Sequence, residues 1–232
     1  MFNKVRKNRR LRKIRLFKRQ EVWILTFQGW LAAIALMMCL VITLIPSIIN
    51  VHSFLAPTVP IKTANILVVE GWLPDYALKE AVSEFNQGSY KFIATTGGAL
   101  EMGSNITGFQ NFADVSAATL KKLGLSEDKI VAVSAPEVVK DRSFQSAVTF
   151  ATWLEKSQLN INSINLLSLG AHTRRSWYLY QKILEPKIKV GIITAHNRDY
   201  NPDKWWTTSS GVRDVIDEGV AFIYARYIHW NA

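Results

Sequence analysis

The chain has 232 residues, of which 49% are hydrophobic and 11% aromatic, and its formal net charge is +10. This composition excludes general disorder, and the single cysteine, Cys39, excludes a disulfide framework within the chain and a cysteine-rich zinc site. Ten of the 28 Lys and Arg residues lie in residues 1–20, so the 18 that follow are balanced by 18 acids. The excess charge is therefore local, and no nucleic-acid-binding domain is expected.

Residues 22–46 are predicted to form a transmembrane helix. The sequence has no charged residue from position 22 to position 61, and its apolar run 22–45 is 24 residues long. A helix of that length crosses a hydrocarbon core about 30 Å thick, and Pro46 is expected to end it. A cleaved signal peptide is the main alternative, although its apolar region is usually only about 7–15 residues.

The basic tail, residues 1–21, sets the expected topology. The positive-inside rule places these cations in the cytoplasm and the C-terminal domain on the other side of the membrane after a single crossing. In a bacterium that is the periplasmic or extracytoplasmic side of the plasma (inner) membrane, and otherwise it is a lumen. The tail is also expected to bind the anionic head groups of membrane lipids. A nucleic-acid-binding arm remains the alternative interpretation of these residues.

Residues 47–63 are interpreted as a linker, and residues 64–232 as one extracytoplasmic α/β domain. Short, nearly continuous apolar runs predict buried parallel strands at 65–69, 91–95, 129–133, 163–168 and 189–193. Amphipathic segments predict helices at 75–87, 109–123, 143–156, 173–184 and 211–227. This alternation is typical of a Rossmann-like, doubly wound, mainly parallel sheet of about five strands.

Ligands bind at the carboxyl ends of the strands in such sheets, so the residues that follow each strand are the candidate site. The expected ligand-binding residues are Thr96, Gly97, Gly98, Asp141, Arg142, Arg174 and Arg175. The expected catalytic residues are His172 and Glu70.

An anionic ligand explains the three arginines best. Arg142, Arg174 and Arg175 stand at predicted helix starts, where a cation opposes the helix dipole unless an anion lies between them. Gly97 and Gly98 are able to form a backbone nest for the same anion, although an ordinary tight turn also explains them. Salt-bridged helix starts are the structural alternative for the arginines.

His172 is a candidate acid or base near neutral pH, and Glu70 is a candidate base, metal ligand or acceptor for the arginines. Both also have purely structural interpretations. A metal site made of Glu70, His172 and His196 has no diagnostic spacing. The sequence has no Walker A motif and no G-x-G-x-x-G, H-E-x-x-H or G-x-S-x-G pattern, so it identifies no cofactor.

Four short motifs in order, ILVVEGW, IATTGG, DRSFQSA and GAHTRRS, make residues 64–224 resemble the YdcF/SanA/ElyC-like family of bacterial proteins. His172 and Arg175 match the family's Ser-x-x-His-x-x-Arg-like run. Glu70 and Trp72 replace its glycine-rich first turn, and Arg142 and Gln145 depart from its Asn- and Glu-rich run, which indicates a divergent branch. The resemblance implies a Rossmann-like domain, often membrane-anchored, linked to envelope integrity and to lipid-carrier steps of peptidoglycan or surface-polysaccharide assembly.

The sequence thus predicts a membrane-anchored protein of cell-envelope biogenesis or integrity. Its α/β domain is expected to bind a phosphate-bearing ligand, such as a polyprenyl phosphate or a sugar phosphate. One alternative is a non-catalytic scaffolding module that holds envelope-assembly proteins through the same pocket or through Trp205 and Trp206. Another is a transferase that depends on a nucleotide cofactor, which is suggested only by fold analogy. Whether the protein is an enzyme is left open.

Overall fold

The computed structural model describes residues 22–227 of the chain. The basic tail, on which the topology and lipid-binding predictions depend, lies outside these residues. The chain divides into two compact units, one that ends at Leu44 and one that begins at Ile45. The second unit contains the α/β domain together with the last turns of the first helix.

Helix α1 (Phe27–Leu55) is the one helix of the described residues that is long and apolar enough to cross a membrane. The prediction that it ends at Pro46 is wrong, because the proline lies inside the helix. An internal proline removes one backbone hydrogen bond and disfavours a helix. Here the last turn is held by tertiary packing, since His52 and Leu55 are buried in the second unit. The predicted linker is therefore helical as far as Leu55.

The sheet has five parallel strands in the order β3-β2-β1-β4-β5, which is a Rossmann-like arrangement. All five strands occur where the apolar runs predicted them, within one or two residues at each end. Their bounds are β1 (Ile66–Glu70), β2 (Phe92–Gly97), β3 (Ile130–Ser134), β4 (Ser163–Leu169) and β5 (Lys189–Ala195). The fold class predicted from the sequence is confirmed.

The five predicted helices of the domain are all present, and the short helix α3 (Ser104–Thr107) is additional to them. The expected helix at 109–123 begins only at Phe112, because the Asn111 side chain accepts a hydrogen bond from the Asp114 backbone (2.9 Å) and caps it. The helices are α2 (Asp75–Gln87), α3 (Ser104–Thr107), α4 (Phe112–Lys122), α5 (Arg142–Ser157), α6 (Thr173–Leu184) and α7 (Ser209–Tyr227). Single 3₁₀ segments are η1 (Glu127–Lys129), η2 (Gly170–His172) and η3 (Pro202–Thr207).

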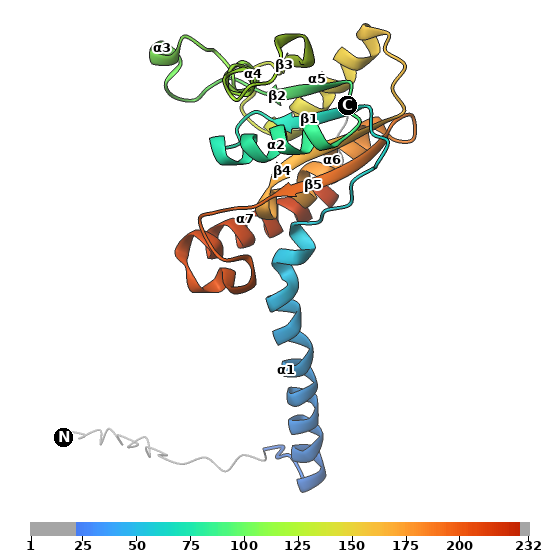
Figure 1. The fold of residues 1–232 in the computed structure, drawn as a ribbon. Helices are drawn as coiled ribbons and strands as arrows, with labels where there is room; N and C mark the ends of the chain where they lie inside the picture. The colour runs from blue at the N-terminus through green and yellow to red at the C-terminus, as the bar shows by residue number, and fades with distance from the viewer. Residues whose placement is uncertain (1–21, 228–232) are drawn as a thin grey trace, which may run out of the picture. The chain divides into compact units, whose positions relative to one another are not determined.

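Two helices cover each face of the sheet (Figure 1). Phe150 of α5 and Tyr180 of α6 pack on one face, where they meet alternate residues of the strands. Leu78 of α2 and Leu120 of α4 pack on the other face. Because both faces are covered, each strand reads as a continuous apolar run rather than an alternating one.

A third, smaller core joins α7 to the last turn of α1. Leu55, Ala171, Tyr200, Trp205 and Val215 are buried together in this core. Trp205 therefore packs inside the protein, whereas the scaffolding alternative used it, with Trp206, to hold partners. This core places α7 across the carboxyl edge of the sheet, beside the candidate site.

Two adjacent glycines at the end of β2 have different structural roles. A Cβ at Gly97 would lie 2.7 Å from the Cβ of Phe112, so the absent side chain lets α4 approach the sheet. At Gly98, the nearest heavy atom to an added Cβ is the Pro136 oxygen at 3.8 Å. Only the first glycine is thus required by packing.

We therefore expect Gly97→Ala to lower the free energy of unfolding by about 1–3 kcal/mol, as overpacked core positions do. The matched variant Gly98→Ala should stay within about 0.5 kcal/mol of wild type. Urea unfolding of the full chain in detergent, followed by tryptophan fluorescence, measures both. Equal losses in the two variants would contradict this assignment of roles.

Candidate functional site

A cavity of about 610 Å³ lies at the carboxyl edge of the sheet. Its walls come from the ends of β1 and β2, the first turns of α5 and α6, and one side of α7. The sheet order reverses between β1 and β4, and such switch points are where open α/β sheets bind ligands. Eight of the nine predicted site residues line this cavity: Glu70, Thr96, Gly97, Gly98, Asp141, Arg142, His172 and Arg175.

Arg174 is the ninth predicted site residue, and it does not line the cavity. Its Nε donates a hydrogen bond to the Phe54 carbonyl oxygen (2.6 Å), and its guanidinium lies 4.2 Å from the centre of the Phe54 ring. Successive residues of a helix point about 100° apart, so Arg174 and Arg175 face different surroundings. The expected role of Arg174 in an anion clamp is corrected to one of fixing the end of α1.

Glu70 is buried at the end of β1, where two hydroxyl groups hold its carboxylate. Ser176 of α6 donates to Oε1 (2.7 Å), and Ser168 of β4 donates to Oε2. Burial alone would raise the pKa of Glu70, but the nearby His172 charge and these hydrogen bonds outweigh it and lower the pKa. Glu70 is consequently ionised at neutral pH, and both of its carboxylate oxygens already accept hydrogen bonds from the two serines.

His172 lies between two carboxylates. Its Nδ1 is 2.8 Å from Oε1 of Glu218, and its Nε2 is 3.6 Å from Oε1 of Glu70. A carboxylate only accepts, so Nδ1 donates to Glu218 when it carries a proton. A terminal nitrogen of Arg175, which only donates, also lies 2.9 Å from Nδ1. The contact with Glu70 is too long for a hydrogen bond, and the buried Nε2 has no hydrogen-bond partner. The Trp72 ring packs edge-on against the imidazole, with 4.8 Å between centroids.

Glu218 of α7 also holds Arg175. The Arg175 Nε donates to Oε2 (2.8 Å) and a terminal nitrogen donates to Oε1 (3.0 Å), which is a bidentate pair. The other terminal nitrogen reaches the Ser143 hydroxyl (3.3 Å) at the start of α5. Arg175 therefore ties three helices together, and its charge is neutralised within the protein.

The two carboxylates keep His172 protonated. Burial would lower the pKa of His172, but the charge of Glu70 and the hydrogen bond to Glu218 outweigh burial and raise the pKa to about 9. Burial would likewise raise the pKa of Glu218, yet its hydrogen bonds to His172 and Arg175 lower it to about 2. The buried network of Glu70, His172, Arg175 and Glu218 therefore holds two negative and two positive charges at neutral pH.

Glu218 was missed by the sequence reasoning, although a signal exists. It shares one face of α7 with Val215, Phe222 and Ala225, all of which are buried or packed in the protein. An acidic residue on the inward face of a helix requires a buried partner. The sequence alone does not say which cation supplies it, because His172 is 46 positions away.

Arg142 differs from Arg175 because its side chain is 60% exposed at the mouth of the cavity. Its partner is Glu101, whose side chain is also exposed. Asp141, the N-cap residue of α5, has a left-handed backbone (φ 59°) and makes no side-chain capping bond. The N-terminus of a 16-residue helix and a solvent-exposed guanidinium thus stand together at this mouth.

The segment Thr96-Gly97-Gly98 does not form the expected nest. Neither glycine has a positive φ, which an anion nest requires at alternate residues. The Thr96 hydroxyl is buried against the Tyr180 hydroxyl (3.0 Å), and the Gly98 carbonyl accepts a bond from Phe112. This segment lines the cavity and supports α4, as an ordinary strand end does.

His196 lies apart from His172 and Glu70, in a second hollow of about 280 Å³ that His52 also lines. The three residues of the conceivable metal site are therefore not brought to one cavity. Within residues 22–227, no group of three or more His, Cys, Asp or Glu residues is placed to hold a metal ion.

Comparison of the chain with models of known protein families finds no match. Comparison with curated proteins finds no match either.

The network predicts how stability depends on pH. The folded pKa of His172, about 9, exceeds the ordinary value of 6.5, so its contribution is complete below about pH 6.5 and is lost as the pH rises through 9. The loss amounts to about 3 kcal/mol at about 1.4 kcal/mol per pKa unit. Titration of the histidine ring protons by NMR should show one histidine with this raised pKa, and His172→Gln should remove that signal.

Glu218→Gln is the sharper variant of this experiment, because it keeps the shape of the side chain but removes one of the two charges that face His172. The pKa of His172 should fall toward its ordinary value. Glu155→Gln, which breaks the exposed ion pair with Lys187, is the control and should leave the titration unchanged. A histidine pKa that is the same in wild type and Glu218→Gln would disprove the assigned network.

Proposed function

We propose that the protein is anchored in the bacterial plasma membrane, that it acts in cell-envelope biogenesis, and that its cavity binds a phosphate-bearing ligand. The resemblance of four motifs to the YdcF/SanA/ElyC-like family supports the cellular role. The apolar helix α1 supports the anchor. The geometry of the cavity mouth supports the class of ligand.

The observation that carries the ligand class is the pairing of Arg142 with the N-terminus of α5. The positive end of a helix dipole attracts phosphate, and the N-cap side chain does not occupy that end. Arg142 is paired only across the surface with Glu101, and exposed pairs are worth about 0–1 kcal/mol. A phosphate group is therefore able to replace Glu101 as the partner of Arg142. We expect Arg142, and not Arg175, to bind it.

The size and lining of the cavity suit a phosphate joined to an apolar or sugar group. Small-molecule sites measure about 300–1,000 Å³, and this cavity of about 610 Å³ lies within that range. Trp72, Phe112 and Leu179 supply apolar wall beside the charged groups. A polyprenyl phosphate and a sugar phosphate both combine these properties.

Within this proposal, His172 acts as a proton donor rather than as a base. A pKa of about 9 leaves the imidazole protonated at neutral pH. Glu70 accepts from two serine hydroxyls and lies 3.6 Å from Nε2 of His172. Its part is thus to hold His172 in its charged form, and not to remove a proton from a ligand.

The nucleotide-cofactor alternative receives less support from the geometry. Rossmann-type dinucleotide sites need a glycine-rich turn between the first strand and the next helix. Here Trp72, Leu73 and Pro74 fill most of that turn. The one glycine, Gly71, is packed so closely that an added Cβ would lie 2.6 Å from the Phe112 carbonyl oxygen.

A ligand-induced shift in thermal stability tests the phosphate site. The full chain in nanodiscs should be stabilised by a short-chain polyprenyl phosphate or by glucose 1-phosphate, by about 2.7 kcal/mol at 100 times the dissociation constant. Arg142→Gln removes one charge-assisted contact worth about 1.5–3 kcal/mol, so binding should weaken about tenfold or more. The matched control is Lys187→Gln, which breaks another exposed ion pair, between Lys187 and Glu155, neither of which lines the cavity.

Inorganic phosphate serves as the minimal probe in the same assay. Stabilisation by inorganic phosphate would show that the site binds the phosphate group itself. Stabilisation by only one of the two organic phosphates would identify the group that must be attached to it. A well-folded wild type that none of these compounds stabilises would reject the ligand class and favour the scaffolding alternative.

The proposed orientation has its own test. We expect a reporter that is active only outside the cytoplasm, fused after the last residue of the chain, to be active. A reporter that is fluorescent only in the cytoplasm should stay dark at the same position. Replacing the ten cations of residues 1–20 with Gln should reduce this preference, because they set the orientation. The opposite reporter pattern would place the domain in the cytoplasm.

A further inference from the structure

Helix α7 carries an apolar stripe on its outward face. Ile216, Val220, Ile223 and Tyr227 are 52%, 63%, 58% and 78% exposed. Their spacing of four, three and four residues places them along one side of the helix. We call these four residues the α7 stripe.

The inward face of α7 is apolar as well. Val215 and Ala225 are buried, and Phe222 packs against the same core. A helix that is apolar on both faces is ordinarily covered on both. In the described residues, the protein covers only one of them, and the stripe faces outward. The stripe is therefore fitted to a partner outside this domain.

The position of α7 indicates what that partner is. The last turn of α1 packs directly on α7, with the rings of Phe54 and Phe222 edge-to-face at 5.7 Å and Leu55 in the same core as Val215. The contacts come from the middle of α7, which passes the last turn of α1 (Figure 1). This turn continues the apolar helix α1, so α7 is attached to the chain close to the proposed membrane span.

We propose that α7 lies on the membrane and that the α7 stripe contacts lipid. Three charged residues are exposed on α7 near the stripe, Arg213, Asp217 and Arg226, so the cations outnumber the acid. Tyrosines such as Tyr227 favour the interface between head groups and acyl chains. The sequence after Tyr227 continues with Ile228 and Trp230, which lie outside the described residues. This proposal rests on the proposed membrane anchor and does not depend on the phosphate ligand.

The contact would also orient the cavity. Ala221 and Tyr224 line the cavity together with Glu218. Tyr224 follows Ile223 of the stripe, whereas Ala221 and Glu218 lie on the side of α7 away from the stripe. A bilayer under α7 thus brings the cavity wall to the head-group region. A ligand that is itself held in the membrane would then reach the cavity without leaving the lipid.

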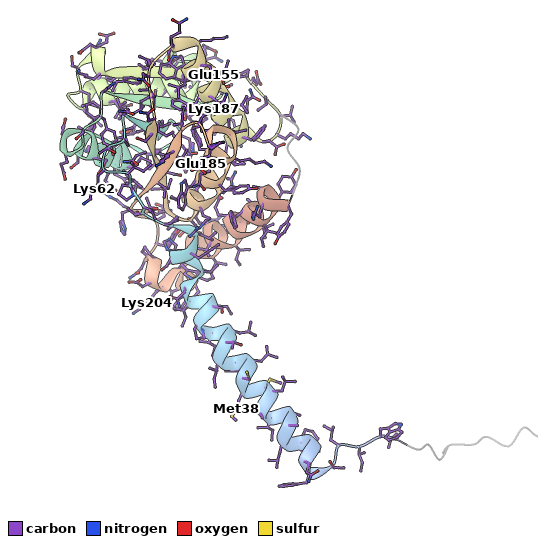
Figure 2. All side chains as sticks on the ribbon, turned by 90° about the vertical axis from the view of Figure 1, so that its right-hand side faces the viewer. Met38, Lys62, Glu155, Glu185, Lys187 and Lys204 are labelled. Carbon is purple, nitrogen blue, oxygen red and sulfur yellow. The ribbon has the colours of Figure 1, made fainter. Side chains whose placement is uncertain are left out.

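Lipid-attached quenchers test the contact in the full chain. Cys39 is the single cysteine of the sequence, so Cys39→Ser provides a background for one new cysteine at a time. Val220→Cys and Ile223→Cys place a fluorescent label on the stripe, and both residues are exposed, so the fold should tolerate them. Lys187→Cys is the control, because its side chain is 82% exposed and it lies close to the amino end of β5, away from α7 (Figure 2).

In nanodiscs that contain nitroxide lipids labelled near the head group, we expect the labels at positions 220 and 223 to be quenched several-fold more than the label at 187. Equal quenching at all three positions would overturn the proposal. Disulfide cross-linking between copies through position 220, with no quenching by lipid, would also overturn it and would assign the stripe to a second copy of the chain.

Discussion

The buried contact between Glu218 and the two cations His172 and Arg175 is the interaction on which the site depends. It joins α7 to the start of α6, while Glu70 joins the same histidine to β1. Removal of one carboxylate would leave a charge uncompensated away from water, and breaking such a buried pair typically destabilises a protein by about 3–5 kcal/mol. The cavity wall formed by α7 is therefore held by charge as well as by the small apolar core around Trp205.

This constraint divides the cavity into two parts with different chemistry. At its floor, four charges neutralise one another, so their positions are fixed and none is free to form a new ion pair with a ligand. At its mouth, Arg142 is exposed and has one surface partner, Glu101. A ligand that binds at the mouth thus meets an adaptable cation in front of a rigid, protonated imidazole. The proposed phosphate site relies on that difference.

Local signals explain how far the sequence prediction reached. Both faces of the sheet are covered, so each strand is a continuous apolar run that can be recognised in the sequence. Ligands bind at the carboxyl ends of such strands, and eight of the residues chosen for that reason line one cavity. The predictions that failed depend on contacts between residues far apart in the sequence. The proline rule was overridden by the packing of Leu55, and the direction of Arg174 was set by Phe54, 120 positions away. Glu218 shows the same limit, since no local pattern names its partners.

In the proposed arrangement, helix α7 connects the site to the membrane because its two sides make different contacts. One side supplies Glu218 to the charged network and Val215 to the core that holds the end of α1, while the outward side carries the stripe. The inward charge explains why α7 cannot turn to bury the stripe: a rotation would withdraw Glu218 from His172 and Arg175 and leave both cations unpaired. The exposure of the stripe is thus enforced by the network, and a surrounding that accepts apolar side chains, which we propose to be lipid, removes the remaining conflict.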